Sequence, residues 1–277
     1  MGRVLKNELY RAFVNKRFFF VIFIEICIVA AHVFVKVIPV ATQTVPYFLA
    51  RPDRIGYMPG AYRTWLASPL YGGYIRLLTM ALLPLLIAVP YGDSLYMDEQ
   101  SRYLYHINTR TGKSRYYLAK ILTLFLSGGT VASFPYLLSF LVNIAILPME
   151  TLIPSTFSGV GNTHCLSGLY YKSPFLYVIA FLILTFIGFG ILNCLCFIAA
   201  YILSSRFLVT LFPFTVDYLM FVIGDFFNVE DYTPWMYLNI DALLKPHIPA
   251  AVIQFSIFTA LIIIIYLYKC SRKADTL

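Results

Sequence analysis

The chain has 277 residues, of which 60% are apolar and 12% are charged, and its mean hydropathy is +0.77. A soluble domain is roughly 45–50% apolar and 25% charged, so this composition excludes a soluble globular enzyme and predicts a chain whose solvent is lipid. The net charge of +8 does not indicate a nucleic-acid partner. In a membrane protein the positions of the cations relative to the apolar segments report topology instead.

Six apolar runs are long enough to cross a hydrocarbon core of about 30 Å, which needs roughly 17–25 helical residues. They cover residues 18–38, 74–91, 117–147, 175–203, 207–227 and 250–268. The third and fourth runs are long enough to tilt or to extend beyond the bilayer. The sequence therefore predicts an all-α polytopic membrane protein with about six transmembrane helices, forming a single transmembrane domain over residues 1–277.

The distribution of Lys and Arg indicates the orientation of these spans. With the N-terminus inside the cell, the cytoplasmic segments hold fourteen Lys and Arg residues and the outer segments hold five. Because an excess of these residues marks the cytoplasmic side, we predict a multi-pass protein of the cell membrane with both termini in the cytoplasm. This topology depends on a short turn at residues 204–206, between the fourth and fifth spans.

Residues 1–17, before the first span, have an amphipathic pattern. Apolar side chains recur at helical spacing, and basic side chains occupy most of the opposite face. The apolar set is Val4, Leu5, Leu9, Ala12 and Phe13, and the polar set is Arg3, Lys6, Asn7, Arg11 and Lys16. The pattern predicts a helix in the membrane interface with its cations toward acidic headgroups; the alternative is a basic anchor that only sets the topology.

The connection between the second and third spans, residues 92–116, is longer than the about 2–8 residues common between the helices of a bundle. It carries Asp98 and Glu99 directly after the membrane and then a short segment with Tyr103, Leu104 and Ile107. The extra length leaves room for a docking helix.

In these features the chain resembles the permease subunits of type-2 ATP-binding-cassette exporters, which have six spans, an N-terminal elbow helix and a coupling loop between spans two and three. The matching segments are residues 5–18 for the elbow, Asp98 and Glu99 for the acidic position, Tyr103, Leu104 and Ile107 for the short coupling helix, and residues 111–120 for the start of span three. The short helix is richer in Tyr and His than the family pattern, and the outer segments 39–73 and 148–173 are unusually long.

The resemblance implies a membrane-spanning subunit that moves a peptide or small amphipathic substrate out of the cell. Two permease chains, identical or homologous, would enclose the path, and a cytoplasmic ATPase subunit would bind ATP and Mg and hydrolyse the ATP. The chain itself would then hold no cofactor, no metal and no catalytic residue. Residues 228–249 would form an outer re-entrant element above the path. No side chain identifies the cargo.

Two acidic residues lie well inside predicted spans. Glu25 lies about 10 Å into span one and Asp217 about 15 Å into span five, at about 1.5 Å per residue. An ionisable group at such depth is costly unless it is paired, hydrated or neutralised. We interpret both acids as candidates to face the translocation path and to meet there, and structural pairing with a neighbouring polar group is the alternative.

Other function classes have weaker support in the sequence. The four histidines are scattered, and the chain has no His-Glu-x-x-His, no Gly-x-Ser-x-Gly and no complete phosphate-binding loop, which argues against an enzyme. An ion-coupled secondary carrier would use Glu25 and Asp217 as a relay, although no internal repeat is evident. A non-transporting immunity or sensor protein with the same architecture is a further alternative.

Overall fold

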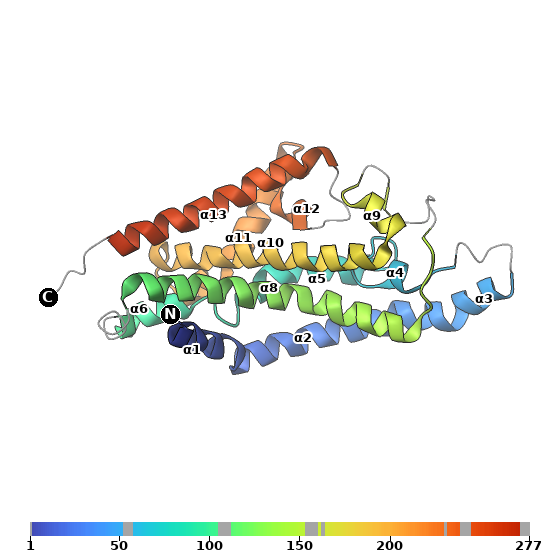
Figure 1. The fold of residues 1–277 in the computed structure, drawn as a ribbon, viewed down its shortest axis with the longest axis horizontal. Coiled ribbons are helices and arrows are strands. Elements are labelled where there is room, and N and C mark those ends of the chain that lie inside the picture. The colour runs from blue at the N-terminus through green and yellow to red at the C-terminus, as the bar shows by residue number, and fades with distance from the viewer. Residues whose placement is uncertain are drawn as a thin grey trace.

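The computed structural model describes residues 2–51, 58–104, 112–152, 160–161, 164–229, 232–238 and 245–271. Every regular element of these residues is a helix, and the longest helices run side by side along one axis (Figure 1). Five of the described helices are long and apolar enough to cross a membrane. The prediction of an all-α polytopic membrane protein is therefore confirmed.

The five long helices match five of the six predicted spans. The first is the continuous helix Lys16–Leu49, made of α2 (Lys16–His32), the π-helical turns η1 (Val33–Val37) and η2 (Val40–Thr44), and α3 (Val45–Leu49). The others are α8 (Lys113–Ile146), α10 (Pro174–Ile202), α11 (Arg206–Phe226) and α13 (Ile248–Ser271). The break between α10 and α11 falls at the turn predicted for residues 204–206.

The first span extends well beyond its predicted end at Ile38. Pro39 lacks an N–H group, and in an α-helix its ring would crowd the carbonyl oxygen of Val35, four residues earlier. The helix widens into π-helical turns on both sides of this proline and continues to Leu49. The predicted outer segment 39–73 thus begins as helix.

The predicted second span is interrupted. Its helix, α5 (Gly73–Leu86), has 14 residues, which at about 1.5 Å per residue cover about 21 Å, less than a hydrocarbon core. Buried turns follow it and lead into α6 (Ser94–Gln100). Residues 58–72, which include α4 (Ala61–Thr64), precede α5 and fold back into the bundle. We call residues 58–72 the plug.

The plug is held by packing and by side chains that satisfy its backbone. The Trp65 ring packs edge-on against Phe140 and Phe181, with centroid distances of 5.4 and 5.2 Å. The N–H group of Leu66 donates to the Ser139 hydroxyl of α8 at 3.0 Å. The irregular backbone of the plug is tolerated inside the bundle because the surrounding helices supply hydrogen-bond partners in place of water.

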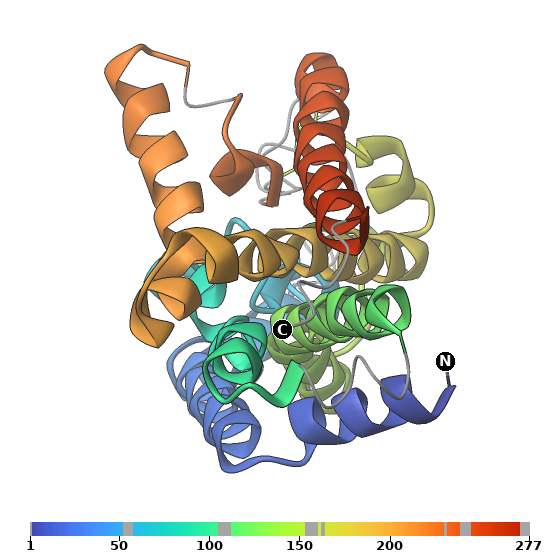
Figure 2. The same cartoon turned by 90° about the vertical axis from the view of Figure 1, so that its left-hand side faces the viewer.

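Helices α8 and α10 form the centre of the fold (Figure 2). A Cβ atom on Gly128 would lie 2.5 Å from the Cβ of Asn193, so only glycine permits this close approach. The Asn193 amide then donates to the Leu124 carbonyl at 2.8 Å. Helices α11 and α13 splay away from α10 and leave most of their surface exposed. The remaining short elements are α9 (Ser167–Lys172), α12 (Pro234–Leu238) and η5 (Lys245–His247).

Helix α1 (Gly2–Phe13) crosses the bundle axis at the end where α6 lies and α8 begins (Figure 2). We call this the α1 end and the opposite end the α4 end. The predicted apolar face of α1 is turned inward, with Ala12 fully buried and Phe13 packed against the core. Asn15 caps α2, because its side-chain oxygen accepts the Phe18 N–H at 2.7 Å while its amide donates to the Ala12 carbonyl at 2.8 Å.

Candidate functional site

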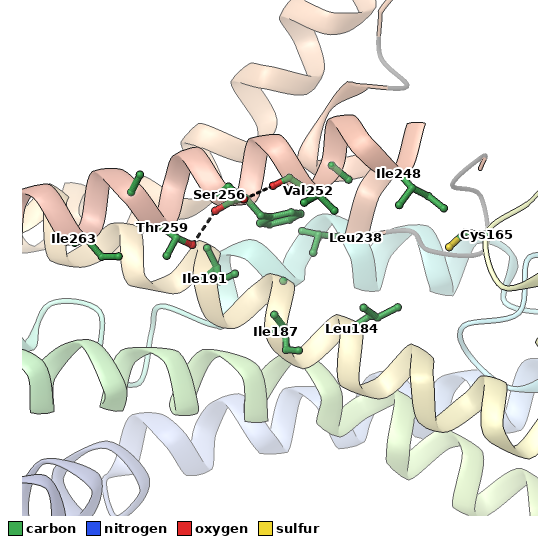
Figure 3. A pocket seen from close by; sticks show the side chains of 14 residues that line it. Cys165, Leu184, Ile187, Ile191, Leu238, Ile248, Val252, Ser256, Thr259 and Ile263 are labelled. Carbon is green, nitrogen blue, oxygen red and sulfur yellow. Dashed lines mark hydrogen bonds between the residues drawn. The ribbon is translucent and has the colours of Figure 1, made fainter. Parts of the chain in front are cut away.

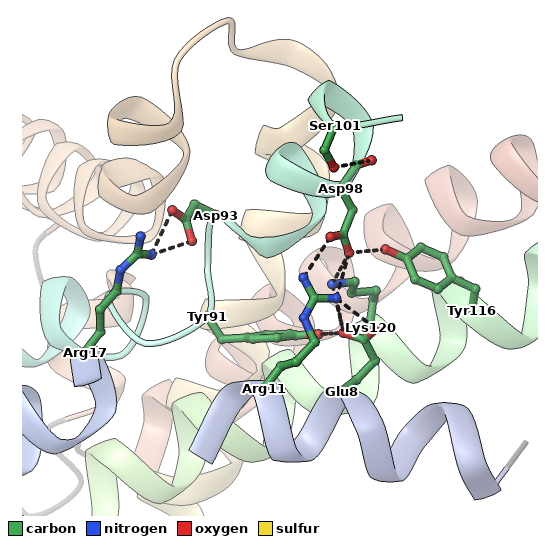
Figure 4. A network of polar contacts seen from close by, with 9 residues as sticks. All are labelled: Glu8, Arg11, Arg17, Tyr91, Asp93, Asp98, Ser101, Tyr116 and Lys120. Carbon is green, nitrogen blue, oxygen red and sulfur yellow. Dashed lines mark hydrogen bonds and ion pairs between the residues drawn. The ribbon is translucent and has the colours of Figure 1, made fainter. Parts of the chain in front are cut away.

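Four segments bring titratable side chains together at the α1 end (Figure 4). Helix α1 and the turn after α5 supply three of them, and α6 and the first turns of α8 supply the others. The members are Glu8, Arg11, Tyr91, Asp98, Tyr116 and Lys120. We call this set the ionic cluster.

Lys120 lies at the centre of the ionic cluster and is fully buried. Its Nζ atom lies 2.9 Å from Oε2 of Glu8 and 2.7 Å from Oδ2 of Asp98. The Tyr91 hydroxyl donates to the same Glu8 carboxylate, and the ammonium group lies 4.8 Å from the centre of the Tyr91 ring. A buried ammonium group is thus compensated by two carboxylates and an aromatic face.

The Asp98 carboxylate receives donors from two other elements, α1 and α8. Arg11 donates to its two oxygens at 2.8 and 3.1 Å, which is a bidentate pair. The Tyr116 hydroxyl donates to Oδ2 at 2.5 Å. Burial alone would raise the pKa of Asp98, but the hydrogen bond from Arg11 and the Lys120 charge outweigh it and hold that pKa below its ordinary value. Asp98 is therefore an ionised structural partner.

The two acids and two bases of the ionic cluster balance in formal charge. Burial opposes the charge on Arg11, but Asp98 and Glu8 raise the pKa of its guanidinium group above its usual range. Such a group is costly to break, since removal of one partner leaves a buried charge without compensation. The cluster consequently holds α1, α6 and the start of α8 in one arrangement.

A second set of ion pairs lies at the same end. Arg17 at the start of α2 donates to both oxygens of Asp93 at 2.9 Å. Arg206, the first residue of α11, approaches the same carboxylate at 3.4 Å. Asp93 thus connects the beginnings of two spans to the turn before α6.

The predicted coupling residues have different environments. Asp98 is buried in the ionic cluster, whereas Glu99 is half-buried; burial raises the pKa of Glu99, and Lys269 lowers it. The Tyr103 side chain is 41% exposed and Leu104 is buried. Ile107 lies outside the described residues, as does most of the predicted short helix. Tyr103 is thus the described apolar residue of this segment that a partner can reach.

The two predicted intramembrane acids are both buried. Glu25 is completely buried in α2, and neither of its carboxylate oxygens has a hydrogen-bond partner among the described residues. Asp217 in α11 is 1% exposed, and its Oδ1 atom also has no partner there. The two acids do not hydrogen-bond to each other, and α5 packs against both α2 and α11. That the two carboxylates face one path together stays a prediction.

Sequence reasoning missed Tyr116 and Lys120 as partners of Asp98, and it missed Glu8 and Tyr91 as further members of the ionic cluster. A signal was present at Glu8, because an acid occupied the inward face of an otherwise basic amphipathic helix. Lys120 lies in the first turns of α8, where the sequence pattern indicates a cytoplasmic cation at the start of span three. Pairing these charges requires knowing that α1 lies across α8, which local patterns do not reveal.

Comparisons of the chain with protein-family models, with curated proteins and with solved structures gave no match. The geometry of the α1 end therefore carries the functional argument. Each charged member of the ionic cluster is engaged by an opposite charge, so the cluster is suited to holding segments together rather than to acid–base chemistry.

Proposed function

We propose that the chain is the membrane-spanning permease subunit of an ATP-binding-cassette exporter of the type-2 class. Its cargo would be a peptide or small amphipathic compound, and a separate cytoplasmic ATPase subunit would bind ATP and Mg. A second permease chain would complete the path. The α1 end would face the cytoplasm, and the distribution of Lys and Arg supports this orientation.

The observation that carries this proposal is the link between the two helices that flank residues 101–112. Asp98 of α6 binds Lys120 and Tyr116 of α8, and Arg11 of α1 binds the same carboxylate. A partner that pushes on the loop between α6 and α8 therefore moves both flanking helices together. A flexible connection would absorb the same displacement.

Helix α8 extends this link to the α4 end. Its 34 residues run from the ionic cluster to the plug, where Asn143 accepts a hydrogen bond from Thr64 at 2.8 Å and Ser139 accepts one from Leu66. A tilt of α8 driven at the α1 end would displace its contacts with the plug. The proposal thus assigns α8 as the element that transmits the action of the ATPase.

The test is co-purification of an ATPase with the tagged chain from its native membrane. We expect Tyr103→Asp, alone and combined with Ile107→Asp, to abolish recovery of ATP hydrolysis, since a docking surface buried in a groove does not tolerate an unpaired charge. Tyr10→Asp is the matched control, because Tyr10 is 65% exposed on α1 at the same end. Unchanged recovery in the double variant, or no ATPase with the wild type, would refute the proposal.

The burial of Glu25 and Asp217 without full hydrogen bonding favours a second candidate, an ion-coupled carrier. Ionisable groups inside spans commonly mark ion or proton pathways. Reconstituted vesicles without ATPase separate the two candidates: a carrier moves cargo in response to a pH or ion gradient, whereas the exporter subunit alone does not.

A further inference from the structure

An apolar groove lies between α10 and α13, with α12 at one side (Figure 3). Its volume is about 560 Å³, within the about 300–1,000 Å³ of typical ligand pockets. Leu184, Ile187, Leu238, Val252 and Ile263 are among the residues that line it. The groove exists because α13 splays from the bundle and does not pack closely along α10.

The two hydroxyl groups that line the groove already donate their hydrogens within α13. Ser256 donates its hydroxyl hydrogen to the Val252 carbonyl at 2.7 Å, and Thr259 donates to the Phe255 carbonyl at 2.8 Å. The largely aliphatic lining therefore favours hydrocarbon in the part of a ligand that enters. A second apolar cavity of about 520 Å³, between α8, α10 and α13, shares Ile191, Thr259 and Ile263 with the first, so the apolar surface continues along α13.

A lysine stands close in the chain to one end of the groove. Cys165 and Ile248 line this end, and Lys245 lies three residues before Ile248 with an exposed side chain. Lys245 belongs to η5, which leads directly into α13 and its groove-lining residues. Burial raises the pKa of the Cys165 thiol at this end, and the positive charge of Lys245 opposes that increase. A cation at the mouth of a hydrocarbon slot complements a molecule with an anionic head and an apolar tail.

We propose that this groove binds an anionic phospholipid, with an acyl chain between α10 and α13 and its phosphate beside Lys245. The chain spans a membrane, so lipid is the solvent that reaches this face. The positive charge of Lys245 favours anionic phospholipids over neutral ones. The site does not depend on the transport proposal, because it needs neither the ATPase nor cargo.

Fluorescence quenching by brominated lipids tests the site in the full chain. Trp235 belongs to α12, whose Leu238 lines the groove, whereas the other tryptophan, Trp65, is 2% exposed and adds a constant background. We compare vesicles containing phosphatidylglycerol or phosphatidylcholine with bromine on the acyl chain. One favourable charge near the rim predicts about a two- to fivefold preference for phosphatidylglycerol in quenching of Trp235.

Two variants and one control make the test specific. Lys245→Glu should remove the preference for phosphatidylglycerol. Gly188→Leu should also remove it, since even a Cβ atom there would lie 2.5 Å from Cδ2 of Leu238 and the larger side chain must displace this wall of the groove. Lys172→Glu, which changes another exposed cation in the segment before α10, should keep it. Equal quenching by both lipids in the wild type, or an unchanged preference in Lys245→Glu, would overturn the proposal.

Discussion

Glu8 and Glu25 are both almost completely buried, yet their surroundings are opposite. Glu8 accepts hydrogen bonds or ion pairs from Arg11, Tyr91 and Lys120, whereas neither oxygen of Glu25 has a hydrogen-bond partner among the described residues. The α1 end compensates its buried charges, and the interior of the first span leaves one acid without compensation. Buried charges that have oppositely charged partners are expected where segments are held together. A buried acid without such a partner is expected where the residue has a functional role.

The largest effect is expected from Lys120→Met, which leaves Glu8 and Asp98 buried side by side with less compensation. We expect a loss of about 3–5 kcal/mol in the free energy of unfolding, measured by thermal or denaturant unfolding in detergent. Arg115→Met is the control, because Arg115 is exposed on the same helix.

A second substitution shows whether charge balance causes that loss. Adding Glu8→Gln to Lys120→Met restores the formal neutrality of the ionic cluster, so the double variant should be more stable than Lys120→Met alone. A double variant that loses the sum of the two single effects would show that the cluster acts through packing instead.

The same substitution in the two regions should have effects of opposite sign. Glu8→Leu should destabilise the protein because it removes a partner of Lys120 and Arg11. Glu25→Leu should stabilise it by about 1–3 kcal/mol, the cost of burying a polar group without a hydrogen bond. Both are measured by the same unfolding assay. A loss of stability in Glu25→Leu would mean that this acid is a structural partner and would remove it from the candidate path.

A smaller effect is expected at the joint between α1 and α2. Asn15→Ala removes the cap of α2 and should cost about 1 kcal/mol, with faster hydrogen exchange confined to the first turn of α2. Asn7→Ala, at an exposed position of α1, is the control and should leave exchange there unchanged. Equal exchange in both variants would show that the ionic cluster alone orders this joint.

Glu150, at the α4 end, is intermediate between the compensated Glu8 and the uncompensated Glu25. Its protonation should give the smallest of these effects, confined to its surroundings. Burial raises its pKa to about 7, while its Oε1 atom accepts the Arg63 N–H of the plug at 2.8 Å. The pKa of Glu150 is higher in the folded protein than in the unfolded chain, so its protonation stabilises the fold. This contribution to the free energy of unfolding is complete below about pH 4.3 and is lost as the pH rises through about 7. Hydrogen exchange in the plug, corrected for intrinsic rates, should be faster at pH 8 than at pH 5.5. Glu150→Gln should abolish this difference, and a persistent difference would assign it to another group.

Much of the fold was predictable because the signals are local. Five spans follow from runs of apolar residues, and the inward face of α1 follows from side chains three and four positions apart, such as Leu9 and Phe13. The break at residues 204–206 was predicted from the interval between two apolar runs. In each case neighbouring residues determine where the chain prefers lipid to water.

The sequence by itself thus determined that the chain is helical, that it lies in a membrane and that its N-terminal helix is amphipathic. Only the tertiary structure decided that Pro39 would not end the first helix, that the plug would pack ahead of a short α5, and that Asp98 would be buried. Arg11 and Asp98 are 87 residues apart in the chain, and their pairing exists because α1 crosses α8. Local patterns indicate whether each segment prefers lipid or water. The free-energy cost of a buried charge depends instead on which distant segments pack beside it.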